Sequence, residues 1–392
     1  MGRRISGNLW RSIGLLVIWL AFPALAAAAY YLLAILSAAR WRRSTARQNP
    51  GTWTPPISIL KPVHGRDPRF YEAILSHATQ DYPEFELLFG VTDSQDPALA
   101  DIEHLRREFP GRRIEIVVVE TGAPNAKVGV LAELARYARH ELLLVNDSDI
   151  KVEPGYLRSV VAPLADPHIG LVTCLYRARS DSWASHFEAL GIATEFAPSV
   201  LVARLLGQAE FALGSTMVFR AGALQKIGGF QTIAKYVADD YQLGWHIRQL
   251  GYRIEFAPVV VETDLGAATW AHTWSHQVRW SRTIRVSRPG GYYGYLITHA
   301  TFWALVAFAG GEWWSGALAL AIRMIAGVLV GTAILRDRTV LGRFWLIPLR
   351  DLFGFAVWVA GVFGNRVQWR DQSLLLGPGG VIQPIDQAKN TK

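Results

Sequence analysis

The feature that most constrains this chain is an apolar, uncharged run near its start, from Ile13 to Leu36. A helix that crosses a bilayer needs about 20 such residues, and its backbone must satisfy its hydrogen bonds within the segment. The run therefore predicts a transmembrane helix over residues 13–36, after an N-terminal segment of residues 1–12. A cleaved signal peptide is the alternative, because Ala24-Leu25-Ala26 resembles a cleavage site. We favour a retained anchor because the apolar run continues past that site.

Apolar residues return in the last third of the chain, where residues 295–364 predict about three further transmembrane helices. The three stretches are Tyr295 to Ala309, Ala317 to Leu335 and Phe344 to Phe363, and the first is short for a full crossing. Arg323 lies inside the second stretch, where it could snorkel, pair with a neighbouring helix or contact a lipid headgroup. Residues 365–392 are expected to form a C-terminal tail.

Arginines flank these apolar stretches and predict their orientation. They follow the first run and separate the last two, at Arg40, Arg42, Arg43, Arg47, Arg336, Arg338 and Arg343. Short loops rich in arginine face the cytoplasm, so the polar middle of the chain is predicted to lie on that side.

Composition agrees with an integral membrane protein that carries a large polar domain. Apolar residues make up 51% of the chain, the mean hydropathy is +0.17 and the formal net charge is +8. A basic membrane protein attracts anionic lipid headgroups and phosphate-bearing substrates. Nucleic acid is not expected as a partner, because no recognition module is present. The single Cys174 excludes an intrachain disulfide and a multi-cysteine metal site.

Strand-like and helix-like segments alternate over residues 50–268, which predicts an α/β domain with a mostly parallel sheet flanked by helices. The expected strands are residues 57–60, 86–91, 114–119, 141–145 and 253–261, and the expected helices are residues 67–79, 98–109, 128–138, 182–206 and 237–250. Ligands of such sheets bind outside the carboxyl ends of the strands. Asp93 and Asp147-Ser148-Asp149 both follow predicted strands.

Two acidic motifs are candidates for chemistry. In an extended stretch Asp147 and Asp149 share one face, where they could hold a divalent cation together with substrate phosphates. Asp239-Asp240 is a like-charged pair, which raises the pKa of one member and suits a general base. Each has a plainer interpretation: a solvated turn for the first motif and an acidic helix cap for the second. Asp93 could contact a nucleoside, or it could close a turn.

A third candidate region, residues 269–292, predicts an amphipathic helix in the membrane interface. Trp270, Trp274 and Trp280 suit headgroup depth, and arginines recur at every third position from Arg279. The sharper alternative places Arg279 on a diphosphate, whose oxygens match its fork of donors, and Trp280 under a sugar or acceptor.

Taken in order, these motifs resemble those of the ceramide glucosyltransferases, family 21 of the glycosyltransferases, which have a GT-A fold. The resemblance runs from about Pro56 to Arg288. The matching pieces are Leu60-Lys61-Pro62 with Gly65, Gln80-Asp81-Tyr82-Pro83, Asp93 with Asp96-Pro97-Ala98, Asn125-Ala126-Lys127, Asp147-Ser148-Asp149, Gly228-Gly229-Phe230, Ala238-Asp239-Asp240-Tyr241 and Arg279-Trp280.

The resemblance implies roles for individual residues. Asp240 would be the catalytic base. The nucleotide-sugar would be bound by Asp93, Asp147, Lys127, Arg279 and Trp280. Asp147 and Asp149 would bind a divalent cation, Mg²⁺ or Mn²⁺. Two residues have no settled role: Asp239 neighbours the base, and His276 stands where the family motif has Gln or Arg.

The implied reaction is a single inverting displacement on a UDP-sugar by the hydroxyl of a membrane lipid. UDP-glucose and ceramide are the expected substrates, and the cytoplasmic side of a bacterial inner membrane is the expected place. The chain is also similar to the bacterial glycosyltransferases of hopanoid biosynthesis, so transfer of N-acetylglucosamine to a hopanoid polyol is the alternative. A processive polysaccharide synthase is disfavoured because its channel would need more spans. An inactive lipid-binding protein is disfavoured because Asp149, Asp240 and Arg279 are intact.

Overall fold

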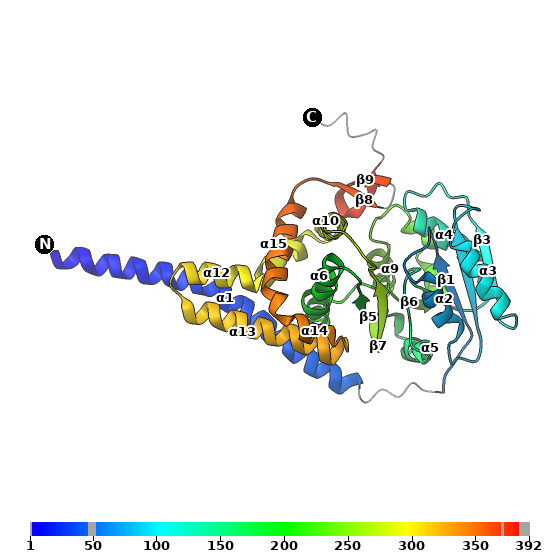
Figure 1. The fold of residues 1–392 in the computed structure, drawn as a ribbon, viewed down its shortest axis with the longest axis horizontal. Helices are drawn as coiled ribbons and strands as arrows, with labels where there is room; N and C mark the ends of the chain where they lie inside the picture. Colours follow the sequence, from blue (N-terminus) through cyan, green and yellow to red (C-terminus); the bar gives the residue numbers. More distant parts are fainter. Residues whose placement is uncertain (1, 46–51, 370–371, 384–392) are drawn as a thin grey trace. The chain divides into compact units, whose positions relative to one another are not determined.

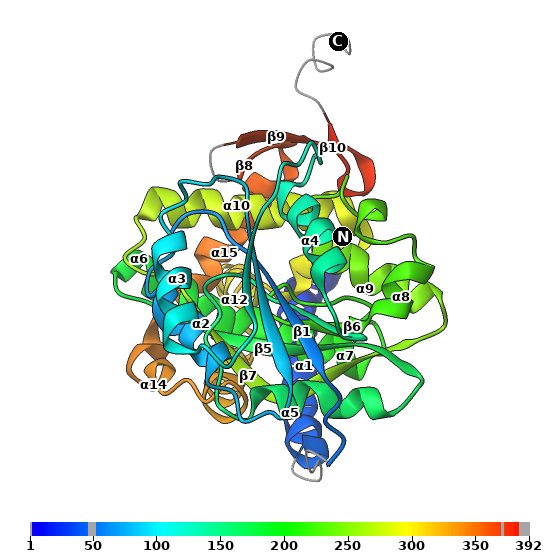
Figure 2. The same ribbon diagram turned by 90° about the vertical axis from the view of Figure 1, so that its right-hand side faces the viewer.

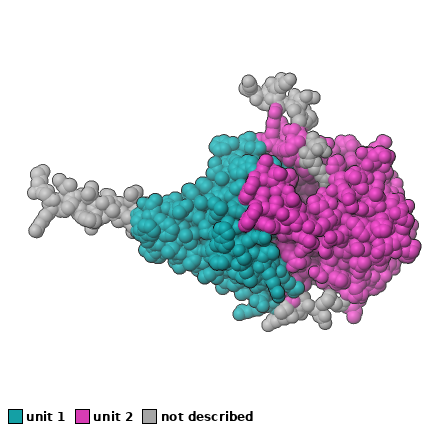
Figure 3. All heavy atoms as spheres, viewed as in Figure 1, with its two compact units in different colours: residues 1–44, 187–206, 273–364 teal, residues 45–186, 207–272, 365–392 magenta. Residues whose placement is uncertain are grey.

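The computed structural model describes residues 2–45, 52–369 and 372–383, and the side chains from residue 21 onward (Figure 1). Residue 1, Arg47 and Pro50 therefore lie outside the described residues, and only the backbone is described for residues 2–12. The chain forms two compact units, drawn in teal and magenta in Figure 3. We call residues 1–44, 187–206 and 273–364 the helical unit, and residues 45–186, 207–272 and 365–392 the sheet unit.

A seven-stranded sheet forms the centre of the sheet unit, in the order β3-β2-β1-β4-β6-β5-β7. Its strands are β1 (Ile57–Pro62), β2 (Phe85–Val91), β3 (Ile114–Val118), β4 (Leu142–Val145), β5 (Ile169–Arg179), β6 (Met217–Arg220) and β7 (Arg253–Asp264). β6 runs antiparallel to β4 and β5, and the other pairings are parallel. The mostly parallel sheet predicted from the sequence is confirmed. Strand order reverses between β1 and β4, which is where ligands of such sheets bind.

Helices cover both faces of this sheet (Figure 2). They are α2 (Phe70–Ala78), α3 (Leu99–Glu108), α4 (Ala126–Tyr137), α5 (Tyr156–Val161), α8 (Ala221–Lys226) and α9 (Asp239–Gln249). Ile57 and Ile59 of β1 pack in a cluster with α2, α3 and α5, whereas Leu60 packs in the opposite cluster with α4, α8 and α9. Burial of both faces explains why these strands read as continuous apolar runs.

The helical unit consists of long apolar helices and shorter connecting ones. They include α1 (Gly2–Thr45), α6 (Trp183–Gly191), α7 (Ala197–Leu205), α10 (Trp270–Ser287), α11 (Pro289–Gly294), α12 (Ala300–Ala309), α13 (Trp313–Leu329), α14 (Thr339–Arg343) and α15 (Ile347–Val362). The first residues of α6 and α10 belong to the sheet unit. Among the residues that the structure describes, three segments are long and apolar enough to cross a membrane: Ala21–Thr45, Trp313–Ile334 and Thr339–Val362.

The observed helices differ from the predicted ones in two places. The stretch expected to begin at Tyr295 forms a short 3₁₀ turn and then α12, an apolar helix of 10 residues, which is below the length of a span. The helix expected over residues 182–206 is interrupted by a π-helical turn at Ile192–Phe196, between α6 and α7. The cytoplasmic orientation and the interfacial position of α10 remain predictions.

The C-terminal tail contains structure that the sequence did not indicate. β8 (Arg366–Trp369), β9 (Gln372–Leu376) and β10 (Ile382–Gln383) form a small antiparallel sheet within the sheet unit. β10 has two residues, too few for a periodic pattern. Strands this short are specified by the partners that they meet in the folded chain, so local sequence reasoning misses them.

Candidate active site

A buried polar chain supports the end of β4 at the point where strand order reverses. Lys61 of β1 is fully buried, and its Nζ donates to Asn146 Oδ1 at 2.9 Å and to the Asp147 carbonyl at 3.1 Å. Asn146 Nδ2 then donates to His77 Nε2 at 2.8 Å, and His77 Nδ1 donates to the Ala73 carbonyl at 2.9 Å. Burial lowers the pKa of Lys61 to about 7, although Asp149 and Asp147 oppose the change. Lys61 belongs to the Leu60-Lys61-Pro62 motif, but the sequence did not predict its contact with Asn146 and the Asp147 carbonyl.

Lys127 joins the two acidic motifs. It lies in the first turn of α4, and its Nζ is 2.8 Å from Asp147 Oδ1 and 3.1 Å from Asp239 Oδ2. Burial alone would lower the pKa of Lys127, but attraction to Asp147 and Asp239 outweighs it and raises the pKa above its ordinary value. Lys127 therefore keeps its positive charge at neutral pH. The family resemblance implied that Lys127 and Asp147 bind the nucleotide-sugar, and the structure shows that they contact each other and that Lys127 also contacts Asp239.

Asp240 is held by backbone amides at the start of α9. Its Oδ2 accepts from Gly214 N at 3.0 Å, and its Oδ1 accepts from Tyr241 N at 2.7 Å. Burial, reinforced by the neighbouring charge of Asp239, raises the pKa of Asp240 to about 6. The helix begins after Ala238 without a side-chain cap at that position. Asp239 faces Lys127, so the pair is more than an acidic helix cap.

Gly214 marks the centre of this cluster. A Cβ on Gly214 would lie 3.2 Å from Asp147 Oδ2, 3.5 Å from Asp240 Oδ2 and 3.7 Å from Lys127 Nζ. These three side chains therefore surround one point, in the turn that precedes β6. They come from the end of β4, the start of α4 and the start of α9, which only the tertiary fold brings together.

Asp149, the second carboxylate of the Asp-x-Asp motif, takes different neighbours. Its Oδ2 accepts from the Thr263 hydroxyl and, at 3.3 Å, from Asp264 N at the end of β7. Burial, followed by repulsion from Asp147, raises the pKa of Asp149 to about 6. The two carboxylates of the motif thus feel each other's charge while they contact separate parts of the sheet unit.

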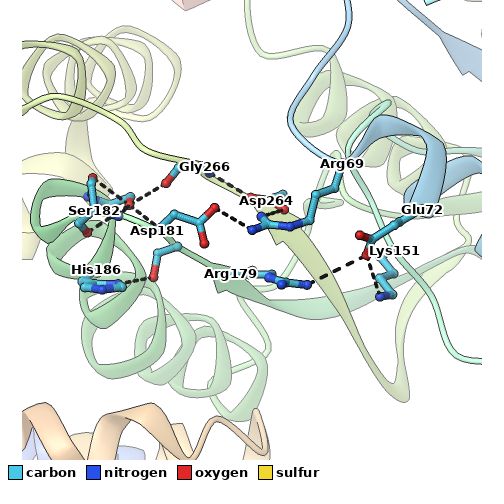
Figure 4. A network of polar contacts seen from close by, with 11 residues as sticks. Arg69, Glu72, Lys151, Arg179, Asp181, Ser182, His186, Asp264 and Gly266 are labelled. Carbon is cyan, nitrogen blue, oxygen red and sulfur yellow. Dashed lines mark hydrogen bonds and ion pairs between the residues drawn. The ribbon is translucent and has the colours of Figure 1, made fainter.

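A small pocket beside Asp149 is lined by charges of both signs. Arg69 is 2.6 Å from Asp264 and 2.7 Å from Asp181, and Lys151 is 3.2 Å from Glu72. Figure 4 shows Arg69 between the two aspartates, with Lys151 and Arg179 directed toward Glu72. Arg69 has a positive φ of 52°. A non-glycine residue adopts this backbone only where its surroundings hold it there.

The donor set near Asp147 suits a cation that is completed by its substrate. The described residues contain no group of three or more histidine, cysteine, aspartate or glutamate side chains that could cage a metal ion. The Asp147 side chain is 44% exposed, however, and it lies close enough to Asp149 for its charge to raise the pKa of Asp149. Mg²⁺ is usually bound by one or two carboxylates, with substrate phosphates and water as further ligands. These residues fit that arrangement and do not fit an all-protein cage.

Asp93 lies in the loop after β2, as predicted, but its visible contact is local. The side chain is exposed, and Oδ1 accepts from Gln95 N at 2.8 Å, which closes a turn. The neighbouring Asp96 is buried and accepts from Gly65 N at 2.7 Å, so it joins the loops that follow β1 and β2. The nucleoside contact of Asp93 remains a prediction.

His276, Arg279 and Trp280 lie on α10 in the helical unit. His276 Nδ1 is 2.6 Å from Oε1 of the buried Glu188, which also accepts from Gln277 Nε2 at 3.0 Å. Burial would raise the pKa of Glu188, but the contacts from His276 and Gln277 outweigh it and lower the pKa. The residue whose role was open thus has a structural partner. The predicted donor contacts of Arg279 and Trp280 remain predictions.

Comparison with known proteins finds relatives that are similar to about half of the chain. Ceramide glucosyltransferase 1 of Caenorhabditis elegans is 29% identical over 197 residues, which cover 49% of this chain and 42% of that protein. Ceramide glucosyltransferase 3 of the same species is 28% identical over 204 residues, which cover 51% and 44%. The matches thus span less than half the length of these relatives.

A solved structure supports the fold independently. The mannosyltransferase PcManGT from Pyrobaculum calidifontis, in complex with GDP-Man and Mn²⁺, aligns with a TM-score of 0.51 and 21% identity, over 88% of this chain and 99% of that one. The likeness confirms the predicted GT-A architecture. The family model described as glycosyl transferase family 21 matches residues 18–382 of the 392. The chain therefore belongs to glycosyl transferase family 21.

Proposed function

We propose that this protein is a membrane-bound inverting glycosyltransferase, which transfers a sugar from a UDP-sugar to the hydroxyl of a membrane lipid. The observation that carries the proposal is the cluster around Gly214. It combines a carboxylate of raised pKa, Asp240, with a Lys127–Asp147 ion pair at the reversal of strand order. A base beside a place for a diphosphate is what displacement on a nucleotide-sugar requires.

In the proposed step, Asp240 accepts the proton of the acceptor hydroxyl while that oxygen bonds to the anomeric carbon of the sugar. The bond from the anomeric carbon to the diphosphate breaks, and UDP leaves with the electron pair. A pKa of about 6 leaves Asp240 ionised at neutral pH and makes it a stronger base than an ordinary aspartate. Its two backbone hydrogen bonds hold the carboxylate in one orientation.

Asp147 and Asp149 would hold the divalent cation, which neutralises charge on the leaving diphosphate. Lys127 contributes a second positive charge that burial does not remove. Asp239 keeps Lys127 in place through their 3.1 Å contact and raises the pKa of Asp240. Asp93, Arg279 and Trp280 are proposed to contact the donor.

The acceptor is proposed to be a lipid because the chain carries three helices apolar enough to span a membrane, among its described residues. The relatives named ceramide glucosyltransferases favour UDP-glucose as donor and ceramide as acceptor. We propose that the sheet unit faces the cytoplasm, where arginine-rich flanks are retained.

Purified protein in detergent tests this proposal directly. It is incubated with UDP-glucose or UDP-N-acetylglucosamine, each against ceramide, diacylglycerol and a hopanoid polyol, and the lipids are analysed by mass spectrometry. We expect a hexosylceramide from UDP-glucose. An N-acetylhexosamine adduct of the hopanoid would show that the donor is UDP-N-acetylglucosamine and the acceptor a hopanoid, and the proposed transfer of a sugar to a lipid hydroxyl would still hold. No glycolipid from any pair would contradict the proposed function.

Removal of divalent cations provides a second test. A chelator should suppress turnover at least tenfold, and added Mg²⁺ or Mn²⁺ should restore it, because the diphosphate would otherwise leave against unneutralised charge. Chelator-treated Asp240→Asn protein controls for background hydrolysis. Full turnover after exhaustive chelation would exclude the cation.

A further inference from the structure

The loop just before Asp239-Asp240 is bonded on one side by the C-terminal segment. Val237 N donates to the Gly380 carbonyl at 3.0 Å, and Ile382 N donates to the Lys235 carbonyl at 2.8 Å. Tyr236 and Val381 face each other in the antiparallel bridge between these two bonds. A stretch some 140 residues later in the sequence thus contacts the chain three residues before the proposed base.

The other side of the same loop is bonded by Asn125. Its backbone N donates to the Ala234 carbonyl at 2.9 Å, and its Nδ2 donates to the Tyr236 carbonyl at 2.9 Å. Its Oδ1 accepts from Val128 N at 3.2 Å and so caps α4, whose first turn carries Lys127. Asn125 is fully buried. The loop is therefore clamped between the helix that presents Lys127 and the C-terminal segment.

The C-terminal segment is shaped for this contact. Leu374 and Leu376 of β9 are buried, and Leu376 N donates to the Asn365 carbonyl at 2.9 Å. Gly379 and Gly380 have φ of 72° and 82°, which turns the chain back toward β9 at little steric cost. A strand of two residues, such as β10, is not stable alone. Its bonds to β9 and to the loop before Asp239 give it its place.

We propose that residues 365–369 and 372–383, which carry the C-terminal sheet, act as a positioning segment for the catalytic base. The inference rests on the proposed function, and it adds that the C-terminal sheet sets where Asp240 lies. By fixing Lys235–Val237 it fixes the start of α9, and thus the Asp240 carboxylate against Gly214 N. A displacement of about 1 Å at a reacting group can cost on the order of 100-fold in rate.

Ile382→Pro tests this inference, because proline removes the N–H that donates to Lys235. The preceding Val381 has φ −69° and ψ 130°, a backbone that a following proline tolerates. Ile382→Ala is the matched control, since it shortens the same side chain and keeps the N–H. We expect kcat to fall about tenfold or more in Ile382→Pro and less than threefold in Ile382→Ala, with the KM for the UDP-sugar unchanged in both. Equal kcat values in the two variants would overturn the proposal.

A disulfide keeps the test decisive if Ile382→Pro weakens the fold. Cα atoms in a bridge of this kind lie about 4.5 Å apart, within reach of a disulfide. Tyr236→Cys and Val381→Cys are added to the Ile382→Pro chain, whose native Cys174 is buried. Oxidation should restore kcat and reduction should remove it again, in the same protein sample. No recovery in the oxidised form would count against positioning.

Hydrogen exchange separates failure of this inference from failure of the proposed function. Ile382→Pro should speed amide exchange in the peptide containing Val237 and leave β1 and β4 protected. That result requires no substrate, so it holds even if wild-type protein makes no glycolipid. Unchanged exchange around Val237 would overturn docking of the segment, whatever the activity.

Discussion

The two units of this molecule bury charge in different ways. In the helical unit two buried arginines each face one carboxylate: Arg323 contacts Asp351 at 2.5 Å, and Arg350 contacts Glu195 at 3.2 Å. In the sheet unit a single Lys127 faces two carboxylates, and the third, Asp240, bonds only to backbone amides among the contacts described above. Loss of one partner from a buried ion pair destabilises a fold, whereas an unevenly paired cluster shifts pKa values and is a candidate for chemistry.

The matched pair in the helical unit also decides the role of Arg323. Its Nε and Nη2 both bond to Asp351, and Asp351 also accepts from the Thr301 hydroxyl at 2.7 Å. Gly327 leaves room for it, since a Cβ there would lie 2.8 Å from Arg323 Nη1. Of the three interpretations open from the sequence, pairing with a neighbouring helix is the one that holds. A charge inside a predicted span is therefore structural here.

The largest expected effect is the loss of turnover when Asp240 in the Lys127 cluster of the sheet unit is changed. Asp240→Asn removes the proposed base while keeping the side-chain shape, and we expect kcat to fall about 1,000-fold, within the range that general bases contribute. Binding of UDP, measured by calorimetry, should change less than threefold. Asp239→Asn is the matched control, because it removes a charge from the same cluster and keeps the base, and it should lower kcat far less than Asp240→Asn. Wild-type turnover by Asp240→Asn would remove Asp240 from the mechanism.

Breaking the Arg323–Asp351 pair of the helical unit should lower the stability of the fold more than it lowers turnover. Asp351→Asn leaves Arg323 buried without its counter-charge, and we expect a loss of about 3–5 kcal/mol in the free energy of unfolding. The double variant Arg323→Met with Asp351→Leu should recover most of that stability, because no buried charge is left unpaired. Denaturation in detergent measures both. A double variant no more stable than the single one would show that the pair is not the cause.

The pH dependence sharpens the comparison, because it depends on the unmatched charge. The raised pKa of Asp240 means that the base becomes protonated as pH falls through about 6, so kcat should drop tenfold per unit below that pH. Asp239→Asn removes one cause of the raised pKa and should shift this acid limb to lower pH. Profiles of kcat from pH 5 to 8 for both proteins provide the measurement. An acid limb unmoved in Asp239→Asn would argue for another titrating group.

The smallest effect is expected at His276. Glutamine can still donate to Glu188, so His276→Gln should change kcat less than threefold. His276→Ala leaves Glu188 with Gln277 alone and should cost about 1–2 kcal/mol of stability. Thermal unfolding alongside turnover distinguishes the two substitutions. A large loss of kcat in His276→Gln, with stability intact, would move His276 from the structural side of the comparison to the catalytic one.

Local patterns in the sequence were sufficient for much of the architecture. Long uncharged runs predict apolar helices because lipid leaves no alternative. Apolar strands ending in aspartate predict a parallel sheet with polar residues at one edge, and Asp147 lies at that edge as expected. These features depend on residues within one turn or one strand of each other, so they can be recognised without knowing the fold.

The tertiary structure alone decided which of those residues meet. The Lys127 contacts with Asp147 and Asp239, the Asp240 bond to Gly214, the Arg323 pair and the docking of β10 all join distant segments. Such contacts are specified by packing of both sheet faces and by loop closure, which leave no periodic signal in the sequence. The sequence thus identified the candidate residues individually. Which charged side chains pair with one another, and the small sheet in the C-terminal tail, are decided by the tertiary structure.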